Sequence, residues 1–161
     1  MSPHSSLPAA SLQSQWSQDS HFRWQEQPSA FPLAPPSSPA TCLRDVSDYL
    51  QSQAWPVLKN EVGPLILTAS NQWVVVQKVQ LHQQGMAVLH QLASECAQHL
   101  EKWTGGAIRQ RGFSRSHTEL TLNGELSGVL DVLKINEEVW VVGVLFLEAI
   151  TSQYFLEPDA S

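Results

Sequence analysis

The sequence predicts an α+β fold in which an antiparallel sheet, made of a hairpin and a C-terminal meander, is packed by two helices. Three observations lead to this prediction. A long segment repeats apolar residues at helical spacing, two tight-turn signals separate three strand segments near the C-terminus, and the last of these strands is uncharged. An order of helix, hairpin, long helix and meander is typical of helices packed against a largely antiparallel sheet.

The first 40 residues differ in composition from the rest of the chain. They hold seven of its ten prolines, many serines and glutamines, and no valine or isoleucine. A segment with so little to bury cannot offset the entropy of ordering it. We therefore expect residues 1–40 to form a disordered Pro/Ser/Gln-rich tail and residues 41–161 to form a single α+β domain. Deletion of such a tail would leave the melting temperature within a few degrees.

Three aromatic residues interrupt this polar tail, namely Trp16, Phe22 and Trp24. One interpretation takes them as chance aromatics in a disordered segment. The other takes them as a short motif that folds on a partner or on the chain's own domain, because large rings are effective anchors in flexible segments. The sequence leaves both interpretations open.

The first helix and the hairpin follow the tail. Thr41 is a plausible N-cap, and apolar residues then recur at helical spacing at Leu43, Val46, Leu50 and Ala54. Residues 65–69 and 72–80 are rich in β-branched and apolar residues and are joined at Ser70-Asn71, which predicts two antiparallel strands.

The long helix is the element that the sequence predicts most directly. Its apolar residues repeat at intervals of three and four, and Gly105-Gly106 follows as a stop signal. The repeating residues are Met86, Leu89, Ala93, Cys96, Leu100 and Trp103. Because Cys96 lies in this stripe, we expect a buried and unreactive thiol, which also argues against a nucleophilic pair with His99.

The remaining chain predicts strands. Residues 108–113 form a short one, Asn123-Gly124 is a strong hairpin signal, and residues 136–138 make the next turn. The final strand, residues 139–147, carries no charge and must be buried on both faces. We expect one face to meet the long helix and the other, with Trp140 and Phe146, to meet the C-terminal tail or a partner protein.

Motifs for catalysis or cofactor binding are absent from the sequence. The histidines and acidic residues lack metal-ligand spacing, and no glycine-rich phosphate loop opens a helix. We therefore expect a protein that is not an enzyme and that has no metal site and no cofactor. Two cysteines, no basic start before an apolar run and no span of membrane length predict a cytoplasmic protein without a membrane partner.

One charged segment is unusual in a chain of net charge −6. Arg109, Arg111 and Arg115 cluster around Phe113, although the net charge argues against nucleic acid as a partner. The cluster is either a solvated sheet edge that deters aggregation or an anchor for an acidic peptide or C-terminal carboxylate. A third interpretation is an RNA-associated regulator that uses Arg109–Arg115, with Phe113 as its single stacking ring.

The segments "WPVLKNEVGPLIL", "HLEKWTGG" and "EVWVVGVLFLEAI", together with size and element order, resemble small α+β proteins of cyanobacteria that escort other proteins into assemblies. Among these, the chain is most similar to the carboxysome shell assembly chaperones, over roughly residues 41–156. The resemblance implies a protein that binds the tail of a shell subunit, and no family motif assigns site residues.

These observations together predict a non-catalytic protein-binding module, an assembly chaperone or adaptor for a peptide or tail of another protein. The partner-binding residues that we expect are Arg109, Arg111, Arg115, Phe113, Trp140 and Phe146. An outward apolar patch on the final strand would also allow a homodimer. The rival hypothesis is a small ligand-binding domain or enzyme with a pocket between helix and sheet.

Overall fold

The computed structural model describes residues 9–19, 21–26, 39–51, 63–68, 72–114 and 117–150. Their helices are α1 (Ala9–Asp19), α2 (Pro39–Tyr49) and α4 (Gly85–Thr104). Their strands are β1 (Arg23–Glu26), β2 (Leu65–Thr68), β3 (Gln72–Lys78), β4 (Ile108–Ser114), β5 (His117–Leu122), β6 (Glu125–Ile135) and β7 (Glu138–Phe146).

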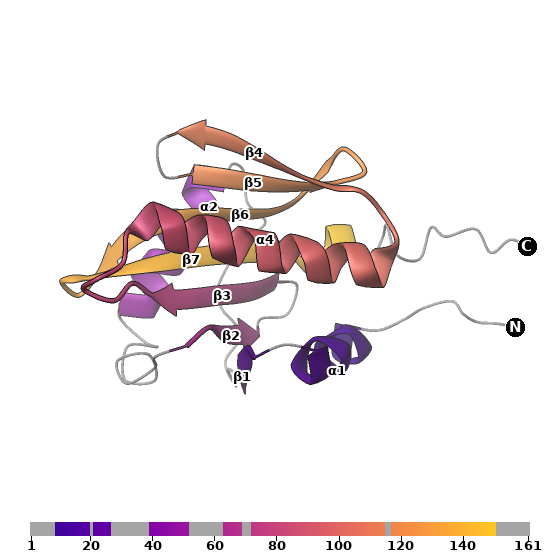
Figure 1. The fold of residues 1–161 in the computed structure, drawn as a ribbon, viewed down its shortest axis with the longest axis horizontal. Helices are drawn as coiled ribbons and strands as arrows, with labels where there is room; N and C mark the ends of the chain where they lie inside the picture. The colour runs from indigo at the N-terminus through magenta and orange to yellow at the C-terminus, as the bar shows by residue number, and fades with distance from the viewer. Residues whose placement is uncertain are drawn as a thin grey trace, which may run out of the picture.

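The predicted α+β class is confirmed. The seven strands form one sheet in the order β1-β2-β3-β7-β6-β5-β4, and every pairing except the parallel β1–β2 pair is antiparallel. Strand β7 lies at the centre of the sheet, between β3 and β6, which explains why its residues 139–146 carry no charge. Figure 1 shows α4 crossing one face of the sheet while α2 lies behind the other.

The helix α4 forms where the apolar spacing predicts it. Its buried stripe faces the sheet, and it ends at Gly105, whose φ of 71° suits a left-handed C-cap. The N–H of Gly105 donates to the Glu101 carbonyl at 2.9 Å, which satisfies one of the last carbonyls of the helix. The stripe packs on the face of β7 that carries Val141 and Leu145.

The opposite face of β7 corrects one expectation. Trp140, Val142 and Val144 are buried there, but the cover is not a partner protein. It is the helix α2, through Leu43 and Val46, together with Leu50 directly after the helix. Phe146 is partly buried against the same cluster. The tail residues that were the other expected cover, 154–156, lie outside the described residues.

Strand β7 also contains a glycine whose position has a packing reason. Gly143 pairs with Leu130 of β6, and a Cβ at residue 143 would come within 2.9 Å of the Leu130 side chain. The larger residue on one strand therefore fills the space left by the smaller residue on the next.

The expectation of a disordered tail is wrong for α1 and β1, which both fall within residues 1–40. Trp16 of α1 is fully buried, with its ring centroid 5.6 Å from that of Trp73 in β3 and 4.9 Å from that of Trp103 in α4. Phe22 and Trp24 join the same cluster. The open interpretation of an aromatic motif that folds on its own domain is therefore supported, and the rest of residues 1–40, beyond Pro39 and Ala40 of α2, lies outside the described residues.

Candidate protein-binding site

Strand β4 forms one edge of the described sheet and carries two of the predicted arginines. On its inner side the N–H of Asn123 donates to the Ala107 carbonyl at 3.1 Å, just before the strand begins. The N–H of Ile108 instead donates to the Glu101 carboxylate at 3.2 Å, away from β5. Alternation along an antiparallel edge then directs the backbone groups of Gln110 and Gly112 away from β5 as well. The edge therefore offers backbone hydrogen-bonding groups to an added strand.

The two arginines on this edge differ in what they contact. Arg109 and Arg111 are both exposed and project from the same face of β4, as the alternation predicts. Arg111 donates to the Glu119 carboxylate at 3.0 Å, with 63% of its side chain exposed against 6% for Glu119. Within the described residues, Arg109 has no carboxylate partner. Arg109 is thus the charge available to a ligand, and Arg111 serves first to neutralise Glu119.

The burial of Glu119 is the feature of this edge that sequence analysis missed. Glu119 sits on β5 between Thr118 and Leu120, in a segment whose alternation suggests an outward polar residue. Its second carboxylate oxygen lies 3.7 Å from Nε2 of His117, whose side chain is also largely buried. A buried carboxylate needs such partners, because desolvation otherwise disfavours its charged form. The pairing of Glu119 with Arg111 across adjacent strands becomes visible only once the β4–β5 register is known.

The other predicted site residues divide into three groups. Trp140 is buried under α2 and is therefore not available to a partner, which corrects its assignment as a contact residue. Phe146 is half-buried against the same cluster, so it offers a partner only part of its surface. Phe113 belongs to β4, and Arg115 lies outside the described residues.

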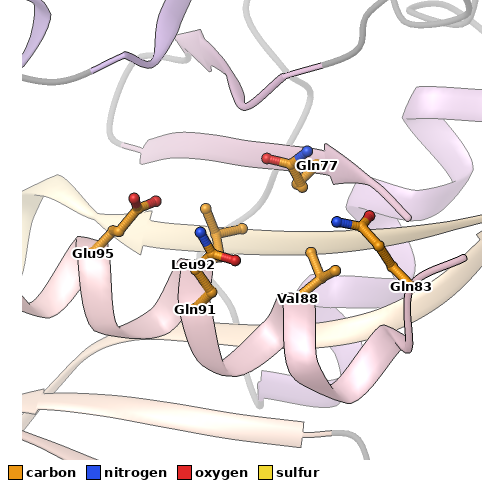
Figure 2. Close-up of a pocket in the computed structure, with 6 residues that line it drawn as sticks. All are labelled: Gln77, Gln83, Val88, Gln91, Leu92 and Glu95. Carbon is orange, nitrogen blue, oxygen red and sulfur yellow. The ribbon is translucent and has the colours of Figure 1, made fainter. Parts of the chain in front are cut away.

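A small pocket lies between α4 and β3, where the rival hypothesis places a ligand. Figure 2 shows Gln77 of β3 facing Val88, Leu92 and Glu95 of α4 across it. Gln83 and Gln91 complete the lining, and the cavity measures about 110 Å³. Pockets for metabolite-sized ligands usually measure about 300–1,000 Å³. This pocket has room for water or a small polar group.

The thiol of Cys96, on the buried face of α4, is not set up for nucleophilic chemistry. Burial, with a smaller effect of the neighbouring Glu95 carboxylate, raises the pKa of Cys96 far above its ordinary value. The imidazole of His99 stacks on Trp16 with ring centroids 5.0 Å apart. The expected burial of the Cys96 thiol is confirmed.

The described residues contain neither a metal-binding cluster nor a membrane-spanning helix. No three or more His, Cys, Asp or Glu side chains there come together in a way that would hold a metal ion. None of the helices described there has both the length and the apolar character that crossing a membrane requires.

A second and larger hollow lies at the far end of β3, beside the β6–β7 turn. It measures about 490 Å³ and is lined by the end of β3, the loop that leads into α4, and Glu137, Glu138 and Val139. Lys78 and Glu138 form an ion pair of 2.9 Å inside it. Leu81, in the loop, is fully exposed, and Val139 is 38% exposed.

The β6–β7 turn that borders this hollow differs from the β5–β6 turn in one residue type. Asn123 and Gly124 take φ values of 52° and 90°, and Asn136 and Glu137 take 49° and 73°. Both turns therefore need positive φ at two central residues, as a two-residue hairpin usually does. Glycine meets this need freely, whereas a residue with a side chain pays about 1–2 kcal/mol. Glu137 is thus held in a strained conformation that glycine would relieve.

Comparison of the chain with models of known protein families, and with curated proteins, found no match.

Proposed function

We propose that this protein is a non-catalytic protein-binding module, an assembly chaperone or adaptor, that adds an extended acidic segment of a partner as a strand on β4. One observation carries the proposal. The backbone groups of Gln110 and Gly112 point away from β5, and the exposed Arg109 next to them in the strand has no carboxylate partner among the described residues, so main-chain hydrogen bonds and a charge contact are available together. Both an internal segment and a C-terminal tail of the partner would fit this arrangement.

The arrangement on β4 supports an acidic occupant over the other hypotheses. An added strand would place every second side chain on the face of Arg109, where a carboxylate can accept paired hydrogen bonds. RNA would need a broader basic surface than one unpaired arginine, in a chain of net charge −6. The rival hypothesis places a ligand between helix and sheet, and the pocket there, between α4 and β3, measures only about 110 Å³. The hollow of about 490 Å³ at the end of β3 lies outside that position.

The resemblance to carboxysome shell assembly chaperones gives this proposal a specific form. In that form the acidic segment is the tail of a shell subunit. The strand-addition mechanism on β4 does not depend on this identity, and the test below uses a defined peptide.

The test is a substitution that removes one outward N–H without removing a bond to β5. In Gln110→Pro the edge loses a donor that strand addition requires, and proline is tolerated on an edge strand when its N–H would face solvent. Gln110→Ala is the matched control, because it loses the same side chain and its long contact with Ser94 but keeps the donor. The probe is a capped octapeptide of alternating valine and glutamate.

We expect the peptide to slow hydrogen exchange at the Gln110 and Gly112 amides, because strand addition engages those donors. The amides of Arg109 and Arg111 already bond to β5 and should change little. Binding should survive Gln110→Ala, fall at least tenfold in Gln110→Pro, and lose its salt dependence in Arg109→Glu. Equal binding by the proline and alanine variants would contradict strand addition, and protection by a poly-uridine probe instead would favour the RNA hypothesis.

A further inference from the structure

The hollow at the end of β3 combines features that the proposed function does not use. Among the described residues, Leu81 and Val139 are the exposed large apolar side chains, and both line this one hollow. Single exposed apolar residues are ordinary on a protein surface, but two that converge on a concave site indicate a contact surface. The hollow lies at the β3–α4 and β6–β7 connections, away from the open side of β4 (Figure 1).

The loop that carries Leu81 is held rigidly. The N–H of Gln83 donates to the Gln80 carbonyl at 2.9 Å, and the N–H of Gln80 donates to the Gln83 side-chain oxygen at 3.0 Å. The N–H of Val79 donates to the Val139 carbonyl at 2.9 Å and ties the loop to β7. A fully exposed leucine on a closed turn loses little conformational freedom when it is buried by a partner. Leu81 is therefore preorganised for contact.

The charges of the hollow favour a basic occupant. Lys78 is neutralised by Glu138 in their 2.9 Å ion pair, and the exposed Glu137 on the rim has no ion-pair partner among the described residues. Glu137 also occupies the turn position with a φ of 73°, which the corresponding turn fills with Gly124. A strained residue kept where glycine would be more stable is consistent with a function for its side chain.

We propose that Leu81, Val139 and Glu137 form a second docking surface, which takes a segment of a partner protein with an aliphatic side chain next to a lysine or arginine. The aliphatic group would enter the hollow between Leu81 and Val139, and the cation would pair with the Glu137 carboxylate. This surface is independent of β4 and has the opposite charge preference.

The test uses amide chemical shifts of the full chain, titrated with a capped hexapeptide of alternating leucine and lysine. The same peptide with glutamate in place of lysine is the comparison. We expect the lysine peptide to shift the amides of residues 78–83 and 137–139, and the glutamate peptide to shift them much less. The glutamate peptide binding equally well or better would overturn the charge preference, since the N-terminus of α4 also lies near the hollow through Gly85.

Three variants separate the contributions of the Leu81 side chain and the Glu137 charge to binding of the lysine peptide. Leu81→Ser should lower the affinity for the lysine peptide about tenfold. It should not lower the stability of the protein, because the side chain of Leu81 is fully exposed. Glu137→Gln should lower the affinity for the lysine peptide a few-fold and remove the salt dependence of binding. The variant still has a residue other than glycine at this turn position, so the turn itself changes little. Glu125→Gln, an exposed change beside the other turn, should have no effect.

Further outcomes of these titrations would overturn the second docking surface or distinguish it from strand addition on β4. No shift of residues 78–83 at millimolar lysine peptide, or an unchanged affinity in Leu81→Ser, would overturn the proposal. Shifts at this surface that depend on protein concentration alone would show that a second copy of the chain occupies it instead. Gln110→Pro should leave the lysine peptide's affinity unchanged, so failure here is distinguishable from failure of strand addition on β4.

Discussion

At one edge of the sheet β1 adds four residues parallel to β2, and at the other edge β4 adds seven residues antiparallel to β5. The short strand is held by aromatic packing, since the ring of Trp16 lies against those of Phe22, Trp24, Trp73 and Trp103. The long strand has exposed polar and charged residues from Arg109 to Gly112. Hydrophobic burial thus secures the β1 edge, whereas the β4 edge exposes charged side chains beside its unpaired backbone. Charge is one means by which edge strands avoid aggregation.

The largest effect that this comparison predicts is at Trp16. Trp16→Ala should lower the free energy of unfolding by about 3–5 kcal/mol, because it leaves a cavity at the centre of the aromatic cluster. That is a large part of a total stability of about 5–15 kcal/mol. Urea unfolding followed by circular dichroism measures it, and Gln18→Ala, on the exposed side of α1, is the control. A loss below 1 kcal/mol would mean that the aromatic cluster does not hold the β1 edge in solution.

Trp16 also marks where sequence analysis failed and why. Its burial reverses the expectation that the tail could be removed with little change in melting temperature. The average composition of residues 1–40 predicts disorder, whereas α1 is held by a few large rings among polar residues. Their partners, Trp73 and Trp103, lie on β3 and α4 far along the chain, so no local pattern reveals the contact.

Elements whose signals are local were predicted well. The apolar repeat of α4, the Asn123-Gly124 turn and the uncharged β7 each contain their own evidence, and the structure has them within a residue or two of the expected bounds. The candidate site was predicted in part. The alternation of Arg109 and Arg111 was visible in the sequence, but the burial of Glu119 depends on the register between strands.

The next largest effect separates the two arginines of the β4 edge. Arg111→Glu should lower the free energy of unfolding by about 1–3 kcal/mol, because it leaves the buried Glu119 without its donor and adds a like charge. Arg109→Glu should change it by no more than about 0.5 kcal/mol, as expected for an exposed residue. The pair of variants is measured by the same urea unfolding. Equal losses would show that Arg109 has a structural partner in solution.

A rescue experiment tests the cause of that loss. If the stability of Arg111→Glu falls because of Glu119, adding Glu119→Gln should restore part of it, since the amide carries no charge to leave unpaired. Additive losses in the double variant would assign the effect of Arg111 to something other than Glu119.

The smallest effect on stability is at Arg109 when its charge is removed in favour of a strand-forming residue. Arg109→Thr should leave the free energy of unfolding within about 0.5 kcal/mol. It should raise self-association at high protein concentration, because a flat, uncharged edge can pair with another edge. Sedimentation velocity over a range of concentrations measures this. If the variant stays as dispersed as the wild type, Arg109 is not needed to protect the edge, which leaves ligand binding as the reason for the charge.

The buried Cys96 thiol can report how often the core of the molecule opens. A thiol enclosed between α4 and the sheet can be alkylated only when that layer opens, so its labelling rate counts openings of the core. The chain has one other cysteine, so Cys42→Ser leaves Cys96 as a single reporter. Because the aromatic cluster of α1 and β1 packs on α4 through His99 and Trp103, near the C-terminal end of the helix, the rate would show whether α1 and β1 detach before the helix does or only together with it.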